Sequence, residues 1–317
     1  MDNLTHSLVG ALIGQAGLKR KTGLAMPALV IGANIPDVDA ACFFWLDGLE
    51  HLAFRRGITH GPIAWVLLPL LLAGVLWWFD RWQERRGKRP EVRLPVRFGW
   101  LYALAFIACL THPALDWLNV YGIRLLEPFS SQWFYGDTLF IIDVWLWLGM
   151  GFATWLSLRR EKTTGCNWRR PARAALVGAV AYIGLNAGIT YSNEAPKGAM
   201  SEPYPRVVIA SPPPIAFWVR ERIIQTGDGR WYSDAWPGKG IGYGYRAPVN
   251  PVCELPPDAA SQSKDADAFL FWSRAPFAER ADDGSVVIRD ARFYDPRARG
   301  RFSVALPEVP CVELAAD

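Results

Sequence analysis

The chain has 317 residues, of which 51% are hydrophobic and 20% charged, and it contains 16 tryptophans but only four histidines. This composition is too apolar and too aromatic for an ordinary soluble domain of this size. The formal charge of +4 is segregated, because residues 1–190 carry the long apolar runs whereas residues 191–317 are polar and rich in Pro and Gly. We therefore predict an α-helical polytopic membrane domain over 1–190, followed by a small, mainly β extramembrane domain over 191–317.

The chain opens with two short apolar pieces, Leu4–Leu18 and Leu24–Ile35, joined by KRKTG. The order of residues is unlike a secretory signal, because polar residues come first and the basic cluster follows the apolar segment. At about 1.5 Å per residue the two pieces reach only ~18 to 23 Å, which predicts a tightly packed hairpin. Gly10 and Gly14 form a small-xxx-small pair, which predicts close approach of a neighbouring helix.

Longer apolar runs follow. Three of them, Gly61–Phe79, Phe98–Leu118 and Leu139–Leu158, are close to the roughly 20 residues that a helical span needs. A fourth, Ala174–Thr190, is shorter but predicts a further span.

Basic residues predict the orientation of these spans. Sixteen Lys and Arg lie in 19–21, 81–97 and 159–173, whereas the connections 36–60 and 119–138 hold only Arg55, Arg56 and Arg124. The positive-inside rule then places the first set in the cytoplasm, and the second set with the C-terminal domain on the periplasmic side of a bacterial inner membrane.

With that orientation, seven His and Asp residues come to the outer side of the membrane. They are His6, Asp37, Asp39, His60, His112, Asp116 and Asp143. Ionisable groups at membrane depth are costly and usually functional, and imidazole and carboxylate are ligands of zinc and similar divalent ions. We predict that these seven residues bind one or two such ions.

Two stretches are central to this prediction. In HPALD, His112 and Asp116 lie four residues apart, so a helix presents both to one ion. Asp37 and Asp39 lie in NIPDVD, interpreted as a non-helical turn, where one carboxylate could bridge two ions. The alternative is a metal-free polar network that is structural or conducts protons. His51 is not expected to take part.

The stretches DNLTHSLVGA, NIPDVD, RRGITHG, HPALDWLNVYGIRLLEPFS and LFIIDVW resemble a bacterial family of inner-membrane metal-dependent hydrolases, which includes LexA-binding members. The resemblance covers most of residues 1–150 and implies the same seven residues as metal ligands. Arg55 stands where the family motif HRGxTH begins with histidine. The spacing also distantly resembles zinc-dependent phospholipase C.

The expected function is hydrolysis of a phosphoester or lipid substrate at the outer leaflet. Asp37 and Arg56 are the predicted catalytic residues, because a guanidinium before His60 can hold a phosphate bidentately. Alternatively, Arg55 and Arg56 form a basic pair that contacts lipid headgroups. Membrane lipids and a lipid-linked phosphate are the expected partners, and no pattern indicates nucleic acid. The rival function is a non-catalytic regulatory membrane protein or a small transporter.

The C-terminal domain shows strand-like stretches at 206–210, 217–225, 229–233 and 285–294, which predict a small antiparallel sheet. A short helix is expected over 265–274. Cys253 and Cys311 would be free to form a disulfide in an oxidising compartment.

Overall fold

A computed structural model describes residues 1–194, 206–227, 229–234, 245–246, 252–294 and 298–314. It divides into two compact units. The first contains Met1–Ala40, Arg56–Gly188 and Pro214–Phe217, and the second contains Ala41–Arg55, Ile189–Pro213 and Trp218–Asp317. The division after Gly188 lies close to the predicted boundary. The assignment of 41–55 to the second unit and of 214–217 to the first was not predicted.

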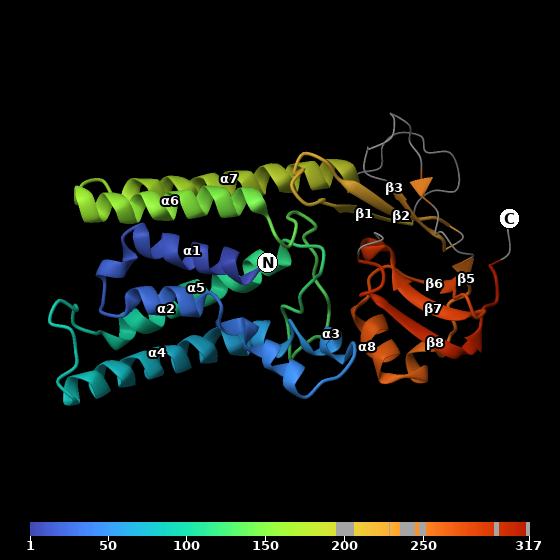
Figure 1. Ribbon diagram of the computed structural model, residues 1–317, viewed down its shortest axis with the longest axis horizontal. Helices are drawn as coiled ribbons and strands as arrows, with labels where there is room; N and C mark the ends of the chain where they lie inside the picture. Colours follow the sequence, from blue (N-terminus) through green and yellow to red (C-terminus); the bar gives the residue numbers. More distant parts are fainter. Residues whose placement is uncertain (195–205, 228, 235–244, 247–251, 295–297, 315–317) are drawn as a thin grey trace. The chain divides into compact units, whose positions relative to one another are not determined.

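The first unit is helical (Figure 1). Its main helices are α1 (Asn3–Gln15), α2 (Ala25–Gly32), α4 (Pro62–Arg85), α5 (Phe98–Trp117), α6 (Val144–Thr163) and α7 (Arg169–Glu194), of which the last belongs to this unit as far as Gly188. Short 3₁₀ helices lie between them: η1 (Leu18–Arg20), η2 (Ile35–Phe44) and η3 (Ile58–His60). Helix α5 packs against both α2 and α4, and α1 packs against both α2 and α6.

Two apolar cores hold these helices together. One joins α2, α4 and α5 and includes Leu29, Leu72 and Leu104. The other joins α1, α6 and α7 and includes Leu12 and Met150. Burying side chains of this size contributes about 1.5 to 3 kcal/mol each in water, and close packing takes over that role within a bilayer.

The predicted hairpin of the first two apolar pieces is confirmed, because α1 and α2 pack against each other. A Cβ atom on Gly10 would lie 2.5 Å from the carbonyl oxygen of Leu29, and one on Gly14 would overlap with Met26 Sδ. The two glycines therefore permit the close approach of α2, as the small-xxx-small pair predicts.

Three described helices are long and apolar enough to cross a membrane: α4, α5 and α7. The count rises to four if the bent pair α2 and η2 forms one span. The predicted run Leu139–Leu158 differs from the structure, since α6 begins only at Val144 and ends in the polar sequence LRREKT. The number of membrane crossings stays a prediction.

The outward faces of these helices are apolar. Helix α4 exposes Leu71 and Trp78, α6 exposes Phe152, and α7 exposes Val177 and Val180. Such surfaces are unfavourable in water but suit the hydrocarbon core of a bilayer.

The described residues of the second unit form two four-stranded antiparallel sheets, in place of the single sheet that was predicted. One has the order β1 (Val207–Ser211), β2 (Glu221–Gln225), β3 (Trp231–Asp234) and β4 (Tyr245–Arg246). The other has the order β5 (Val252–Cys253), β6 (Pro276–Arg280), β7 (Ser285–Asp290) and β8 (Ser303–Pro310). The alternation along β6 and β8 is interrupted by Pro and charged residues, so the sequence pattern did not reveal these strands.

Two further features complete the second unit. Helix α8 (Lys264–Trp272), preceded by η4 (Ala259–Gln262), confirms the predicted short helix and packs against α3 (Glu50–Phe54). The amide of Leu49 donates to Asp265 Oδ1 at 2.8 Å. Cys253 and Cys311 form a disulfide with a Cα separation of 5.3 Å.

Candidate metal centre

Helix termini bring the predicted polar residues together. His6 lies near the start of α1, Asp37 lies in η2 after the end of α2, and His60 ends η3 just before α4. His112 and Asp116 lie in the last turns of α5. The direction of the helices puts all five residues at one end of the bundle, and the basic segments 19–21, 81–97 and 159–173 at the other.

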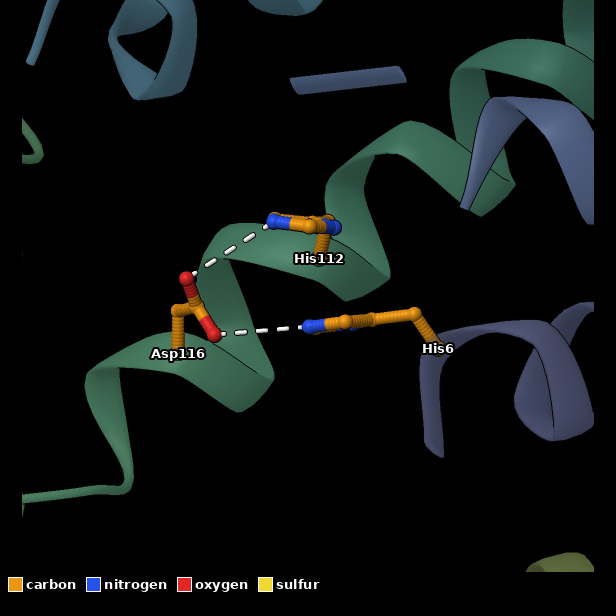
Figure 2. A group of neighbouring side chains, drawn as sticks. All are labelled: His6, His112 and Asp116. Atoms are coloured by element: carbon orange, nitrogen blue, oxygen red, sulfur yellow. Dashed lines mark ion pairs between the residues drawn. The ribbon is translucent and has the colours of Figure 1, made fainter. Parts of the chain in front are cut away.

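The first group consists of His6, His112 and Asp116, all buried (Figure 2). The two imidazole rings stack with their centroids 3.8 Å apart. Asp116 lies beside both rings: its Oδ1 is 3.4 Å from His6 Nε2, and its Oδ2 is 3.6 Å from His112 Nε2. The i, i+4 spacing of HPALD thus presents both α5 side chains to one space, as predicted.

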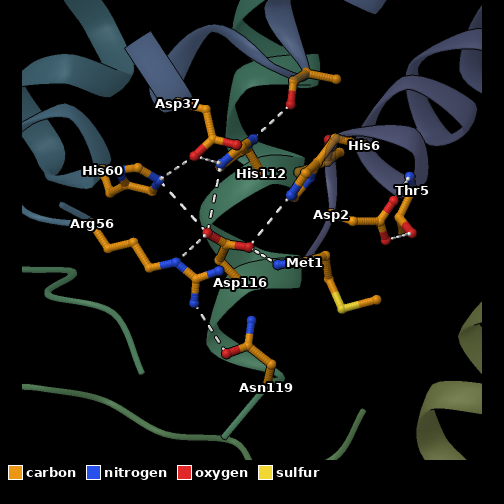
Figure 3. A network of polar contacts seen from close by, with 12 residues as sticks. Met1, Asp2, Thr5, His6, Asp37, Arg56, His60, His112, Asp116 and Asn119 are labelled. Atoms are coloured by element: carbon orange, nitrogen blue, oxygen red, sulfur yellow. Dashed lines mark hydrogen bonds and ion pairs between the residues drawn. The ribbon is translucent and has the colours of Figure 1, made fainter. Parts of the chain in front are cut away.

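The second group consists of Asp37, His60 and His112, and it shares His112 with the first (Figure 3). Asp37 Oδ1 lies 3.7 Å from His112 Nε2 and 4.0 Å from His60 Nε2. His60 Nε2 also lies 3.7 Å from Asp116 Oδ2. The two groups therefore form one cluster of three histidines and two aspartates, which we call the His/Asp cluster.

Hydrogen bonds on the far side of two rings fix their orientation. His112 Nδ1 lies 2.7 Å from the carbonyl oxygen of Ala33, so this nitrogen carries the proton and Nε2 of the neutral ring keeps its lone pair. His60 Nδ1 lies 2.9 Å from Thr59 Oγ1, which in turn lies 3.2 Å from Asp39 Oδ2. Partners of this kind orient metal-binding histidines in proteins.

The geometry of the cluster fits a divalent ion. In a tetrahedral zinc site with ligands at about 2.0 to 2.2 Å, the ligand atoms lie roughly 3.3 to 3.6 Å apart. The separations between carboxylate oxygens and Nε2 atoms in the cluster are 3.4 to 4.0 Å, longer than direct hydrogen bonds. His6 Nε2 and His112 Nε2 are buried and make no hydrogen bond to any described residue. Leaving buried nitrogens unmatched is costly, and an ion would remove that cost.

Positive groups of the chain also reach the cluster. Arg56 Nε lies 3.2 Å from Asp116 Oδ2, and the α-amino group of Met1 contacts Asp116 Oδ1. Arg56 is itself buried, so the interpretation of this residue as part of a surface pair does not hold. Arg55 is separate: it belongs to the second unit and lies over the ring of Phe43.

Backbone contacts hold Arg56 in place. Its backbone is left-handed, with φ of 57°, and its N–H donates to Asp39 Oδ2 at 2.8 Å. Its carbonyl oxygen accepts from the N–H of Arg124. Burial lowers the pKa of the Arg124 guanidinium, although Glu127 and Asp39 oppose the shift.

Two sequence predictions differ in place from the structure. Asp39 lies on the Nδ1 side of His60, 3.5 Å from it, and belongs to neither group of candidate ligands. Asp143 caps α6, accepting from the N–H groups of Trp145 and Leu146, and it also accepts from the Tyr182 hydroxyl. His51 lies in the second unit, with its Nδ1 3.0 Å from the carbonyl oxygen of Gly48, and it belongs to neither group of candidate ligands.

Two participants were missed from the sequence. Thr59 connects His60 to Asp39, and Asn119 accepts a hydrogen bond from Arg56 Nη1 at 3.1 Å. Thr59 had a signal, because it precedes His60 in the quoted motif. For Asn119 the only signal in the sequence was its position just after α5, in the same quoted stretch as His112 and Asp116.

A helical membrane protein with a buried His/Asp cluster at one end of its helices is the class that this structure defines. The profile of the YdjM inner membrane protein family matches residues 1–192, and the chain belongs to that family. The chain is also 27% identical over 141 residues to the uncharacterized protein YfhP of Bacillus subtilis (strain 168). That match covers 42% of this chain and 39% of the relative, so the chain spans about two fifths of the relative's length. No solved structure gives a significant match.

Proposed function

We propose that this protein is a metal-dependent hydrolase of the inner membrane, which acts on a phosphoester or lipid substrate at the outer side. The observation that carries the proposal is the convergence of three buried histidines and two aspartates on one space. His6, His60, His112, Asp37 and Asp116 would hold zinc or a similar divalent ion. Such an ion lowers the pKa of bound water to about 7 and stabilises charge on a phosphoryl or carbonyl oxygen.

The residues around the cluster have separable roles in this proposal. Asp37 is less buried than Asp116, so its carboxylate is the one placed to accept a proton from water at the site. Arg56 holds a fixed positive charge beside Asp116, where an anionic substrate oxygen would be stabilised. Asp39 and Thr59 keep the His60 ring in orientation.

Three observations support the outer location. The basic segments lie at the opposite end of the helices from the cluster, and the positive-inside rule assigns them to the cytoplasm. Ala41–Arg55 belongs to the same compact unit as the C-terminal sheets, which supports a location of both on the same side of the bilayer. The Cys253–Cys311 disulfide in that unit is typical of an oxidising compartment such as the periplasm.

Metal analysis tests the proposal. The full-length protein purified in mild detergent is expected to hold about one or two zinc-like ions per chain, and His112→Ala should lose most of them. His51→Ala is the matched control, because His51 lies outside the cluster, and it should retain the wild-type amount. The loaded protein should release a product from phospholipids or lipid pyrophosphates. Equal metal in the two variants would contradict the proposal.

The contacts of Asp116 favour one rival function. Arg56 and the α-amino group of Met1 already supply positive charge to this buried carboxylate, as a metal-free polar network requires. The cluster would then be a structural or proton-conducting element of a regulatory protein or small transporter. In that case the wild-type protein would be folded but metal-free, and His112→Ala would change its thermal stability without changing its metal content.

A further inference from the structure

Asn119 is a buried residue whose amide group is only half used. Its side-chain oxygen accepts hydrogen bonds from Arg56 Nη1 at 3.1 Å and from the backbone N–H of Tyr121 at 2.9 Å. Its amide nitrogen Nδ2 is buried and makes no hydrogen bond to any described residue. A buried donor that stays unmatched destabilises a protein, so its retention beside the cluster suggests that a ligand supplies the acceptor.

Arg56 presents a second unused donor in the same place. Its Nε is paired with Asp116, and its Nη1 donates to Asn119 and to the carbonyl oxygen of Gly122, also at 3.1 Å. The guanidinium also lies over the ring of Tyr121, 4.6 Å from its centroid. Within the part of the chain that the structure describes, these contacts use Nε and Nη1 but not Nη2. Four neighbours thus hold the guanidinium in place, and none of the contacts described uses its Nη2 group.

The two unused donors face the same way. In Figure 3 the Asn119 amide nitrogen and the terminal Arg56 nitrogen without a dashed line both point toward the Asp116 side of the network. Asn119 follows Asp116 by three residues, at the point where α5 ends. A fixed guanidinium and a neutral amide that point to the edge of a metal-ligand cluster are a donor pair suited to an anion.

We propose that Asn119 Nδ2 and Arg56 Nη2 form a binding subsite for the non-bridging oxygens of a phosphoryl group. The inference rests on the proposed function and adds its substrate class. A phosphoryl group carries several anionic oxygens, so two can meet these donors while another faces the His/Asp cluster. An uncharged ester or amide has a single carbonyl oxygen and leaves one of the two donors unmatched.

Exposed apolar residues that neighbour the cluster residues in the sequence indicate that the phosphoryl group belongs to a lipid. Val38, Ile58 and Trp117 are 54%, 63% and 44% exposed, and they lie within two residues of Asp37, His60 and Asp116 respectively. Exposed apolar residues at the end of membrane helices fit contact with the bilayer interface. The phosphoryl oxygens of a lipid would thus be recognised at the place where its apolar part stays in the membrane.

Binding measurements on the full-length, zinc-loaded protein in detergent test this subsite. The probes are inorganic phosphate and a short-chain phosphatidic acid, measured by calorimetry, with zinc content determined on the same samples. Asn119→Asp keeps the oxygen that accepts from Arg56 and Tyr121 but replaces the donor by an acceptor. We expect it to retain zinc and to bind both probes at least about tenfold more weakly.

Asn186→Asp is the matched control, since Asn186 is equally buried but lies in α7, where its amide donates to Tyr182. It should leave zinc and probe affinity unchanged. If Asn119→Asp does not accumulate in the membrane, Arg56→Lys is tested in its place. Lysine keeps the positive charge but lacks the planar guanidinium, so the same loss of affinity for both probes is expected.

The outcomes separate the two hypotheses. A wild-type protein that takes up no zinc overturns the proposed function. A zinc-loaded wild type whose affinity for both probes is unchanged in Asn119→Asp overturns the subsite alone. Tighter binding of the phosphatidic acid than of inorganic phosphate supports a lipid-borne phosphoryl group, whereas equal affinities would assign the subsite to free phosphate and overturn the lipid assignment.

Discussion

Asp37 and Asp39 are only two residues apart, yet the structure predicts that their removal has different effects on metal binding. Asp37 Oδ1 faces the Nε2 atoms of His60 and His112, where an ion would be held. Asp39 Oδ2 lies behind His60, and it also accepts from Thr59 and from the backbone N–H of Arg56. Asp37→Asn therefore removes a candidate ligand, whereas Asp39→Asn weakens the support of one.

The magnitude follows from these positions. Loss of an outer partner of a metal-binding histidine typically lowers metal affinity about 10- to 100-fold, which is roughly 1.4 to 2.7 kcal/mol. Asp39→Asn should fall in that range, because the asparagine oxygen still accepts from Arg56 while the charge near His60 is lost. Asp37→Asn should exceed it.

Competition with a chelator of known zinc affinity measures both variants, with full-length protein in mild detergent and His51→Ala as the control. Thermal unfolding of the zinc-free proteins shows whether either change has destabilised the fold independently of metal. If Asp39→Asn lost zinc as completely as His112→Ala while Asp37→Asn kept wild-type affinity, the assignment of ligand and support would be reversed and the reasoning from side-chain placement refuted.

Four further predictions follow from other parts of the molecule. Gly10→Ala should lower the free energy of unfolding of the protein in detergent by about 1 to 3 kcal/mol, since a methyl group has no room against α2. Gly149→Ala is the control, because nothing lies within 4 Å of its added carbon, and it should be neutral or stabilising. Cys253→Ser opens a loop of 58 residues and should lower the stability of the C-terminal unit by about 4 kcal/mol, seen as faster hydrogen exchange in β5 and β8. Burial opposes ionisation of Asp290, but the guanidinium of Arg292 outweighs it and holds the pKa of this carboxyl below its usual value. This stabilisation is present above the unfolded-state pKa of about 4 and is lost as pH falls through the lower folded-state value. The protection of the β7 amides, which is the ratio of the intrinsic to the observed exchange rate, should therefore fall on acidification, and less so in Asp290→Asn. Alkaline phosphatase joined after the last residue should be active, and the same enzyme inserted in the basic segment 81–97 should be inactive; the opposite pattern would place the His/Asp cluster on the cytoplasmic side.

Much of the helical unit could be predicted because its signals are local. Long apolar runs indicate spans, and the alternation of basic and polar connections assigns each helix end to a side. That assignment alone gathers His6, His60 and His112 at one end of the bundle. The contact between His112 and Asp116 followed from their four-residue spacing, which needs only a helix to be correct.

The distinction between Asp37 and Asp39 could not be predicted, because it depends on the exact form of η2. The sequence was interpreted as a non-helical turn that points both carboxylates to one side, but the chain forms a 3₁₀ helix there. With three residues per turn, positions two apart point about 120° away from each other. The two carboxylates therefore reach opposite sides of the His60 ring.

Asp143 shows a signal that was given too little weight. An aspartate directly before an apolar helix is a preferred N-cap, because its carboxylate accepts from the first free N–H groups. The predicted depth of Asp143 in the membrane suggested a metal ligand, but its role as the N-cap of α6 already accounts for its position. Depth in the membrane alone does not separate residues that converge on a site from residues that only share its level.

The short first hairpin connects packing to the site. Gly10 allows α1 to approach the backbone of α2 near Leu29. One turn later, the carbonyl oxygen of Ala33, the C-cap of α2, accepts a hydrogen bond from His112 Nδ1. His6, one turn before Gly10 on α1, then stacks on the His112 ring. If α1 and α2 were separated by even one methyl group, His6 and the carbonyl of Ala33 would not both stay within reach of that ring. The glycines were interpreted as packing residues, but in this arrangement the same close packing is also what sets two histidines of the cluster beside each other.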